Sequence, residues 1–485
     1  MRRFVFGALV AAAGVFVTPA AAWAHAELLS STPAYGDRSA APPAEMRLEF
    51  SGAMDLTGAR LTLRERGGRD QSLGRPSLAS PDRRVVAVPL PPRLADGDYR
   101  LDWFFLGNDG HLMAGEVAFG VGAAAPAASV GAAPAAVAGA KPTVAVRSLG
   151  PGIAGPAVDL QAAPASSPGR PRFTIAVATP QAAVRFLDYA CLAILLGGGF
   201  FLALVWVEGT GDRRARRLLW AALLGSGAAT VLTFGLTAAG LRGVGALGAL
   251  RPSVMGALAG TRFARIIAAR IAFLGLGFVV LTMLTLGRDR AVRSRWWQIM
   301  AAGAAGGILV THALLGHASS EGPVARVAVL VHLGGVAVWL GGLVFLAAVV
   351  LPRGRSEEVR TLLPRFSGVA FSAVAAMVVA GAVMVTRVVP ELSALPQTGY
   401  GRMLLLKLAF VALLLVAAQQ ARTFTERKLV RDSTRLRPLL TAVGAELTLA
   451  VVILTATAVL VGRAPPGTRT KAVTAPSATA LKGPR

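Results

Sequence analysis

The chain has 485 residues, of which 54% are hydrophobic, 6% aromatic and 15% charged, and its mean hydropathy is +0.58. This composition is too apolar for a soluble globular protein and favours several membrane-spanning helices. The formal net charge of +25 would ordinarily suggest a nucleic-acid-binding protein. Most of the excess, however, lies in short loops between apolar stretches, where it reports membrane topology, so we expect no nucleic-acid partner. The single cysteine, Cys191, excludes a disulfide framework and a cysteine-based metal site.

Residues 1–24 have the pattern of a secretory signal peptide. Arg2 and Arg3 precede an apolar stretch, residues 4–17, and the small-residue motif Ala22-Trp23-Ala24 follows. An uncleaved anchor helix is the alternative. Cleavage after Ala24 would make His25 the first residue, so that an imidazole and a free α-amine stand on the same residue.

Residues 25–122 read as a domain of short β-strands. The segments 46–50, 59–63 and 99–103 alternate apolar and polar residues, and 84–90 and 116–121 have strand composition. Proline and glycine clusters separate these segments. Short strands at regular intervals, with no helical period, predict a small β-sandwich.

The next segment, residues 123–175, is rich in alanine and proline and nearly uncharged, which predicts a linker. Residues 180–463 then form an all-α polytopic membrane domain, and we expect residues 464–485 to be a disordered tail. About eight spans of roughly 20 residues are predicted. They lie near residues 182–207, 218–241, 264–286, 297–317, 326–351, 367–389, 403–421 and 439–462.

The loops indicate the orientation of the membrane domain. Those after the first, third, fifth and seventh spans hold eighteen basic residues, against five in the loops after the second, fourth and sixth. The positive-inside rule therefore predicts a multi-pass inner-membrane protein with the β domain and the C-terminal tail on the periplasmic side. The signal peptide independently predicts the same orientation.

Only five histidines occur, and this orientation puts all of them on or near the outer side. His111 ends the segment Leu106-Gly107-Asn108-Asp109-Gly110-His111, a tight turn between two predicted strands. With His25 at the mature terminus, Asp109 and His111 would complete a set of one amine, two imidazoles and one carboxylate, which suits Cu(II). A frayed terminus and an ordinary polar hairpin turn are the alternative, because histidine and aspartate are common in turns.

Three stretches resemble the CopC family of periplasmic copper-binding proteins. They are HAELLSSTPAYGD, MRLEFSGAM and YRLDWFFLGNDGHLMAGEVAFGV, and the similarity covers about residues 25–122. The resemblance implies a cupredoxin-like or immunoglobulin-like β-sandwich that binds Cu(II) through His25, Asp109 and His111. The methionine-rich loop that gives some members a separate Cu(I) site is absent here.

The membrane half resembles CopD, the membrane partner of CopC, and fusions of the two are a known arrangement. The resemblance rests on THALLGHASS, VHLGGVAVWLGGLVFL, TGYGRMLLLKLAFVALLL and GAELTLAVVILTATAVLVG, over about residues 182–463. These apolar motifs are less specific than the DGH hairpin.

Polar residues inside apolar spans are candidates for function. His312 and His317 end the fourth span and His332 begins the fifth, so the three form a candidate outer-side copper site, with Cu(I) as an alternative oxidation state there. Interfacial histidines that contact water or lipid headgroups are the other interpretation. Glu446 and Lys407 also lie within spans, but opposite span directions put them at different depths.

The hypothesis from the sequence is a non-enzymatic membrane protein that captures Cu(II) in the periplasm and passes copper to or across the bilayer, in copper uptake, homeostasis or resistance. Periplasmic copper carriers are its expected partners. No ATP-binding motif is visible. A copper- or haem-dependent oxidoreductase, and a copper chaperone or sensor without a pore, remain as alternatives.

Overall fold

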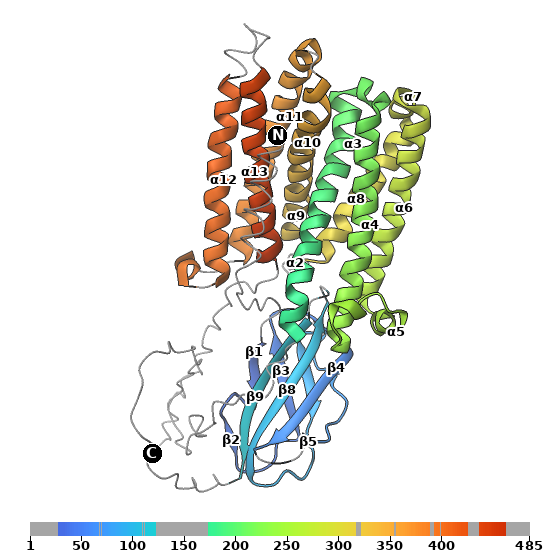
Figure 1. Ribbon diagram of the computed structural model, residues 1–485. Helices are drawn as coiled ribbons and strands as arrows, with labels where there is room; N and C mark the ends of the chain where they lie inside the picture. The colour runs from blue at the N-terminus through green and yellow to red at the C-terminus, as the bar shows by residue number, and fades with distance from the viewer. Residues whose placement is uncertain are drawn as a thin grey trace, which may run out of the picture. The chain divides into compact units, whose positions relative to one another are not determined.

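The computed structural model describes residues 28–66, 68, 70–108, 110, 112–122, 173–316, 322–353, 356–388, 392–397, 399–424 and 436–461. These residues form a unit of strands and a unit of helices (Figure 1). The predicted signal peptide (1–24), most of the predicted linker (123–175) and the predicted C-terminal tail (464–485) lie outside the described residues.

The N-terminal unit is the predicted β-sandwich. Its two sheets have the strand orders β1-β3-β7-β6 and β2-β9-β8-β4-β5, and β2 pairs with β9 in parallel. The strands are β1 (Leu28–Thr32), β2 (Arg38–Ser39), β3 (Glu45–Phe50), β4 (Met54–Glu65), β5 (Asp70–Gln71), β6 (Ser77–Leu78), β7 (Val85–Pro89), β8 (Gly97–Gly107) and β9 (Leu112–Val121).

The alternating sequence pattern places the core of the sandwich. In β3, Met46, Leu48 and Phe50 are fully buried, whereas the intervening Arg47 and Glu49 are exposed. The Phe50 ring packs edge-on against the rings of Trp103 and Phe105, at centroid distances of 5.2 and 5.7 Å. Each such aromatic pair adds about 0.5–1.5 kcal/mol beyond its buried area. The two sheets are therefore joined by a continuous aromatic core.

Among the described residues of the C-terminal unit, eight helices are long and apolar enough to cross a membrane, which confirms the predicted number. They span Pro180–Val205, Arg213–Arg242, Arg262–Gly287, Arg295–Leu314, Pro323–Arg353, Glu357–Arg387, Gly401–Gln420 and Leu439–Leu460. The sixth begins about ten residues before the prediction because its helix continues through the polar, arginine-containing segment that hydropathy excludes. Cys191, in the first span, is buried and free.

These spans are built from a few continuous helices and some short connecting turns. The first span consists of α2 (Phe173–Leu192), η1 (Ala193–Gly197), α3 (Gly198–Phe200) and η2 (Phe201–Val205). The fifth is α9 (Pro323–Val336), η7 (Ala337–Gly341), α10 (Gly342–Phe345) and η8 (Leu346–Val350). The others are α4 (Arg213–Arg242), α6 (Arg262–Gly287), α8 (Arg295–Leu314), α11 (Ser356–Val388), α12 (Gly399–Phe424) and α13 (Leu436–Leu460). The short elements are η3 (Val207–Gly211), η4 (Ala246–Gly248), α5 (Pro252–Met255), η5 (Gly256–Leu258), α7 (Asp289–Arg293), η9 (Leu351–Arg353) and η10 (Leu392–Gln397).

The first and fifth spans cross in the middle of the bundle through π-helical turns. A Cβ on Gly197 would lie 1.8 Å from the carbonyl oxygen of Ala337, and one on Gly341 would lie 2.0 Å from that of Ala193. Both distances are far below van der Waals contact, so only glycine fits at either position. Close approach through small residues is the usual way that helices pack in lipid. The contacting turns, η1 and η7, are both π-helical.

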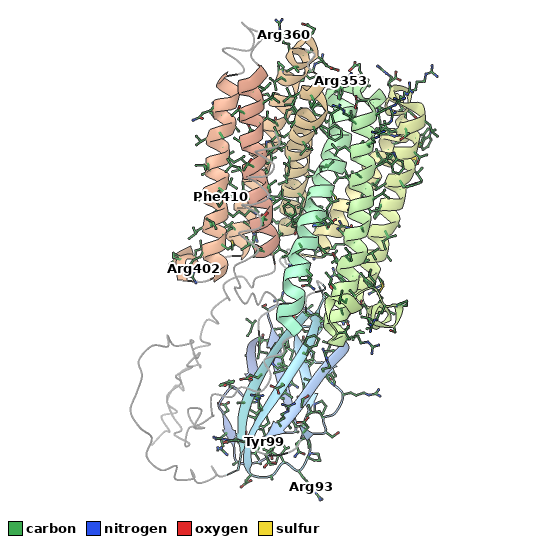
Figure 2. The ribbon with its side chains drawn as sticks, in the orientation of Figure 1. Arg93, Tyr99, Arg353, Arg360, Arg402 and Phe410 are labelled. Atoms are coloured by element: carbon green, nitrogen blue, oxygen red, sulfur yellow. The ribbon has the colours of Figure 1, made fainter. Side chains whose placement is uncertain are left out.

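Charged side chains mark the two ends of the bundle. Figure 2 shows Arg353 and Arg360 at one end, and Arg402 at the other. At the first end, the Asp212 side chain accepts hydrogen bonds from the first backbone N–H groups of α4 and pairs with Arg353 at 2.8 Å. Arg353 also lies 3.4 Å from Glu358 and over the Trp206 ring. This network joins the starts of α4 and α11 to the end of the fifth span.

Candidate functional site

The hairpin predicted to carry the outer copper ligands is formed by β8 and β9. At its tip the Gly110 N–H donates to the Gly107 carbonyl at 2.9 Å, and Gly110 has φ of +84°, in the left-handed region that favours glycine. Asp109 and His111 flank this glycine but, like His25, lie outside the described residues. The structure therefore gives the turn and its two strands, and the ligand set stays a prediction.

Of the three membrane histidines, His312 and His332 are described and His317 is not. His312 lies near the end of α8 and His332 on α9. Their rings have different hydrogen-bond partners, which determine the chemistry that each ring can offer.

His312 belongs to a buried polar cluster that joins four helices. Its Nδ1 lies 2.6 Å from Nη1 of Arg270, on α6, and its ring lies 5.2 Å from that of Tyr189. The guanidinium donates through Nη2 to both oxygens of Asp188, on α2, each at 2.8 Å. The hydroxyl of Ser226, on α4, donates to Asp188 Oδ1 at 3.0 Å. The side chains of Arg270, Asp188 and His312 are only 2%, 11% and 15% exposed.

The cluster is electrically balanced. Asp188 and Arg270 neutralise one another, and a guanidinium can only donate hydrogen bonds, so His312 Nδ1 accepts. A neutral His312 ring then carries its proton on Nε2 and has no lone pair left for a metal ion. Because an unpaired charge at this depth is very costly, the pair fixes α2 against α6.

His332 has the opposite arrangement. Its Nδ1 lies 2.9 Å from the backbone carbonyl oxygen of Met377, on α11. A carbonyl only accepts, so Nδ1 carries the proton and Nε2 of the neutral ring keeps its lone pair. Histidines that bind a metal ion through one ring nitrogen commonly donate the N–H of the other to a carbonyl, which orients the ring.

Lys407 and Glu446, the other polar candidates from the sequence, also lie inside spans. Lys407 lies on α12 and is half-buried. Glu446, on α13, is 6% exposed. Within the described part of the chain, no three side chains of histidine, cysteine, aspartate or glutamate come together as a metal site. His312 and His332 are accordingly not joined in one described ligand set.

Sequence reasoning missed Asp188 and Arg270, which hold the cluster together. A signal was present, because both are charged residues within the predicted spans 182–207 and 264–286. Such residues default to functional candidates. Histidine is rare in this chain, with five residues, whereas arginine is frequent and marks no single position.

Family models match both halves of the chain. The CopC domain model matches residues 28–122, the model of the copper resistance protein D-like N-terminal domain matches 176–327, and that of copper resistance protein D matches 360–460. Copper resistance protein C of Pseudomonas syringae pv. tomato is 36% identical over 116 residues, which cover 23% of this chain and 90% of that protein. The chain belongs to the CopC–CopD fusion proteins.

Other relatives of this CopC–CopD protein match one or both halves. The copper transport protein CutJ of Bacillus subtilis (strain 168) is 23% identical over 411 residues, which cover 82% of this chain and 68% of that protein. The crystal structure of CopC from Methylosinus trichosporium OB3b is 26% identical, with a TM-score of 0.19, and covers 20% of this chain and 93% of that one. The sequence comparisons thus extend from the sandwich through the membrane half.

Proposed function

We propose that this chain is a copper-binding membrane protein of copper homeostasis, whose CopC domain captures Cu(II) outside the cytoplasm and whose CopD half passes copper to or across the bilayer. The observation that carries the proposal is the joining, in one chain, of a CopC match over residues 28–122 to two copper-resistance-protein-D matches over the helices. A relative that aligns with 82% of this chain is named as a copper transport protein. Those relatives are copper transport and resistance proteins, and we propose no enzymatic role here.

Cu(II) capture is assigned to the α-amine and ring of His25 with Asp109 and His111. Nitrogen ligands completed by one carboxylate suit Cu(II), which heads the divalent affinity order. The β8–β9 hairpin supports the assignment because its strands fix the two ends of the turn that carries Asp109 and His111. The signal peptide supports it because cleavage after Ala24 exposes the amine of His25.

The orientation follows from the arginines. We assign the bundle end that carries Arg353 and Arg360 to the cytoplasm and the end with Arg402 to the periplasm, by the positive-inside rule (Figure 2). His312 and His332 then lie in the periplasmic half of the membrane, where copper released by the CopC domain would arrive. The linker raises the local concentration of the captured ion at that surface.

The capture step is tested by Cu(II) titration of the full-length protein in detergent. Asp109→Asn and His111→Ala should each weaken Cu(II) binding by more than the roughly 10- to 100-fold that loss of an outer-shell partner costs. Glu116→Gln is the matched control, because this exposed carboxylate lies on the same hairpin, in β9. Wild-type affinity in both ligand variants would overturn the assignment.

Passage across the bilayer is tested by copper flux into proteoliposomes. A transporter should load the vesicles, whereas a chaperone or sensor without a pore binds copper but leaves the lumen empty. A haem Soret band, or oxygen-dependent turnover by the copper-loaded protein, would favour the oxidoreductase instead.

A further inference from the structure

The first and fifth spans share a sequence pattern that spans their crossing point. Residues 196–205 read LGGGFFLALV and residues 340–349 read LGGLVFLAAV, so seven of ten positions are identical at a spacing of 144 residues. The local structure repeats at the same spacing, because the α-helix changes to a π-helical turn at Ala193 in one span and at Ala337 in the other. The contacts repeat as well, since Gly197 packs on Ala337 and Gly341 packs on Ala193.

A second pattern relates the third span to the seventh. Residues 263–273 read FARIIAARIAF and residues 400–410 read YGRMLLLKLAF, with identical arginine, alanine and phenylalanine positions and conservative changes elsewhere. Phe410, labelled in Figure 2, corresponds to Phe273. Helix packing also corresponds, because α2 packs on α4 as α9 packs on α11, and α6 packs on α8 as α12 packs on α13. The membrane half is thus two copies of one four-span unit.

The two copies place polar residues at equivalent positions. Asp188 lies eight residues before Leu196, and His332 lies eight residues before Leu340. Arg270 and Lys407 are both the eighth residue of the second pattern, in segments 263–273 and 400–410, so they also correspond. In the first copy the cation is bonded to its partner, since Arg270 donates to Asp188. In the second copy His332 and Lys407 occupy the positions of that acceptor and that donor.

The chemistry of the two sites differs in one respect. The first holds a carboxylate whose charge Arg270 already balances, so it has no capacity for another cation. The second holds a neutral imidazole, whose Nδ1 bonds to Met377 and whose Nε2 lone pair is available. Because Lys407 holds the position from which Arg270 reaches Asp188 in the first copy, a metal cation at this lone pair would meet the charge of the lysine.

Building on the proposed function, we propose that His332 is the membrane copper ligand and that Lys407 is a resident cation that opposes copper binding there, as Arg270 closes the equivalent site in the first copy. Cu(I) is the form that the site would take, because it adds the smaller charge beside an ammonium group. Copper binds when the lysine side chain turns away from the ring. Lys407 is a positioning and selectivity residue, and His332 is the ligand.

The test uses the full-length protein with His25→Ala and His111→Ala, so that the outer site is silent. Cu(I) binding is measured in detergent by competition with a chromophoric chelator. His332→Ala should remove the membrane Cu(I) site. Lys407→Leu should tighten Cu(I) binding about tenfold or more, because a like charge is removed from a medium of low dielectric constant and leucine offers no ligand of its own. Lys407→Arg should keep the affinity near or below that of the parent.

Arg402→Leu is the matched control, because it removes an exposed cation from the same helix and should leave Cu(I) affinity unchanged. Lys407→Gln is a second variant in case the leucine protein does not fold. Cu(I) affinity that is unchanged or weaker in both Lys407 variants would overturn the role of the lysine, and a Cu(I) site that survives His332→Ala would overturn the ligand. Neither result touches Cu(II) capture, which is measured separately on the protein with an intact hairpin.

Discussion

Asp188 and Arg270 form an ion pair in the interior of the helical half, with both carboxylate oxygens 2.8 Å from the same guanidinium nitrogen. Ser226 donates a further hydrogen bond to the carboxylate. The Nε of Arg270 is buried without a hydrogen-bond partner among the described residues. The pair is therefore held through Nη2 of the guanidinium alone, while Nη1 bonds to His312.

Removing one partner of this pair should be far more harmful than removing both. Arg270→Leu leaves an uncompensated carboxylate among four helices and should cost about 3–5 kcal/mol of stability. The double variant Asp188→Leu/Arg270→Leu should regain most of that loss, since no charge remains buried. Thermal unfolding of the two single variants and the double variant in detergent measures the coupling. Additive losses would contradict a direct interaction.

Alanine at Gly197 should break the crossing of the first and fifth spans. Its Cβ would overlap the carbonyl oxygen of Ala337, and backbone atoms cannot yield without separating the helices. Gly199→Ala is the control, because a Cβ there meets nothing within 4 Å. We expect Gly199→Ala to fold and bind copper normally, while Gly197→Ala is recovered poorly from membranes or aggregates on size-exclusion chromatography. Equal recovery of the two variants would refute the close packing.

Tyr99 should stabilise the sandwich through its hydroxyl. This side chain is 2% exposed and donates to the Ala95 carbonyl at 2.9 Å. Tyr99→Phe should cost about 1 kcal/mol, or roughly 4–8 °C in the Tm of a domain of this size. Tyr35→Phe, at a 54% exposed position, should change little. Residues 25–122 suit the measurement, because the CopC domain alone matches 90% of a separate protein.

The same residue predicts a pH dependence. Burial raises the pKa of Tyr99 above its ordinary value of 10.0. A raised pKa means that the folded state favours the neutral phenol, so the contribution is fully present below pH 10 and is lost as the pH rises further. The stability advantage of wild type over Tyr99→Phe should shrink in strongly alkaline buffer. A constant difference across that range would contradict the assignment.

Cleavage of the signal peptide should leave His25 as the first residue. Intact mass spectrometry of the purified protein tests this directly. Chemical blocking of the α-amine should then weaken Cu(II) binding by at least the roughly 10- to 100-fold expected for loss of a supporting group. Protein that retains Trp23 and still binds Cu(II) tightly would show that the amine is not a ligand.

The fold was largely predictable because its signals are local. Alternation in residues 46–50 and apolar stretches of sufficient length are read directly from the chain. The short strands β1, β2, β5 and β6 were not predicted, since two to five residues carry little periodicity. The pairing of Asp188 with Arg270 could not be found in the same way, because 82 residues separate them and only the packing of helices brings them together.

Four is an even number of crossings, so a second four-span unit enters the bilayer from the same face as the first. Two such copies are related by rotation about an axis along the membrane normal. They differ from the inverted repeats that let many carriers open alternately to opposite sides. Asp188 and His332 therefore lie at the same depth in the membrane, on opposite sides of this axis. An ion held at His332 has gone no deeper than Asp188, so any inward route must use groups nearer the opposite face, such as Glu446.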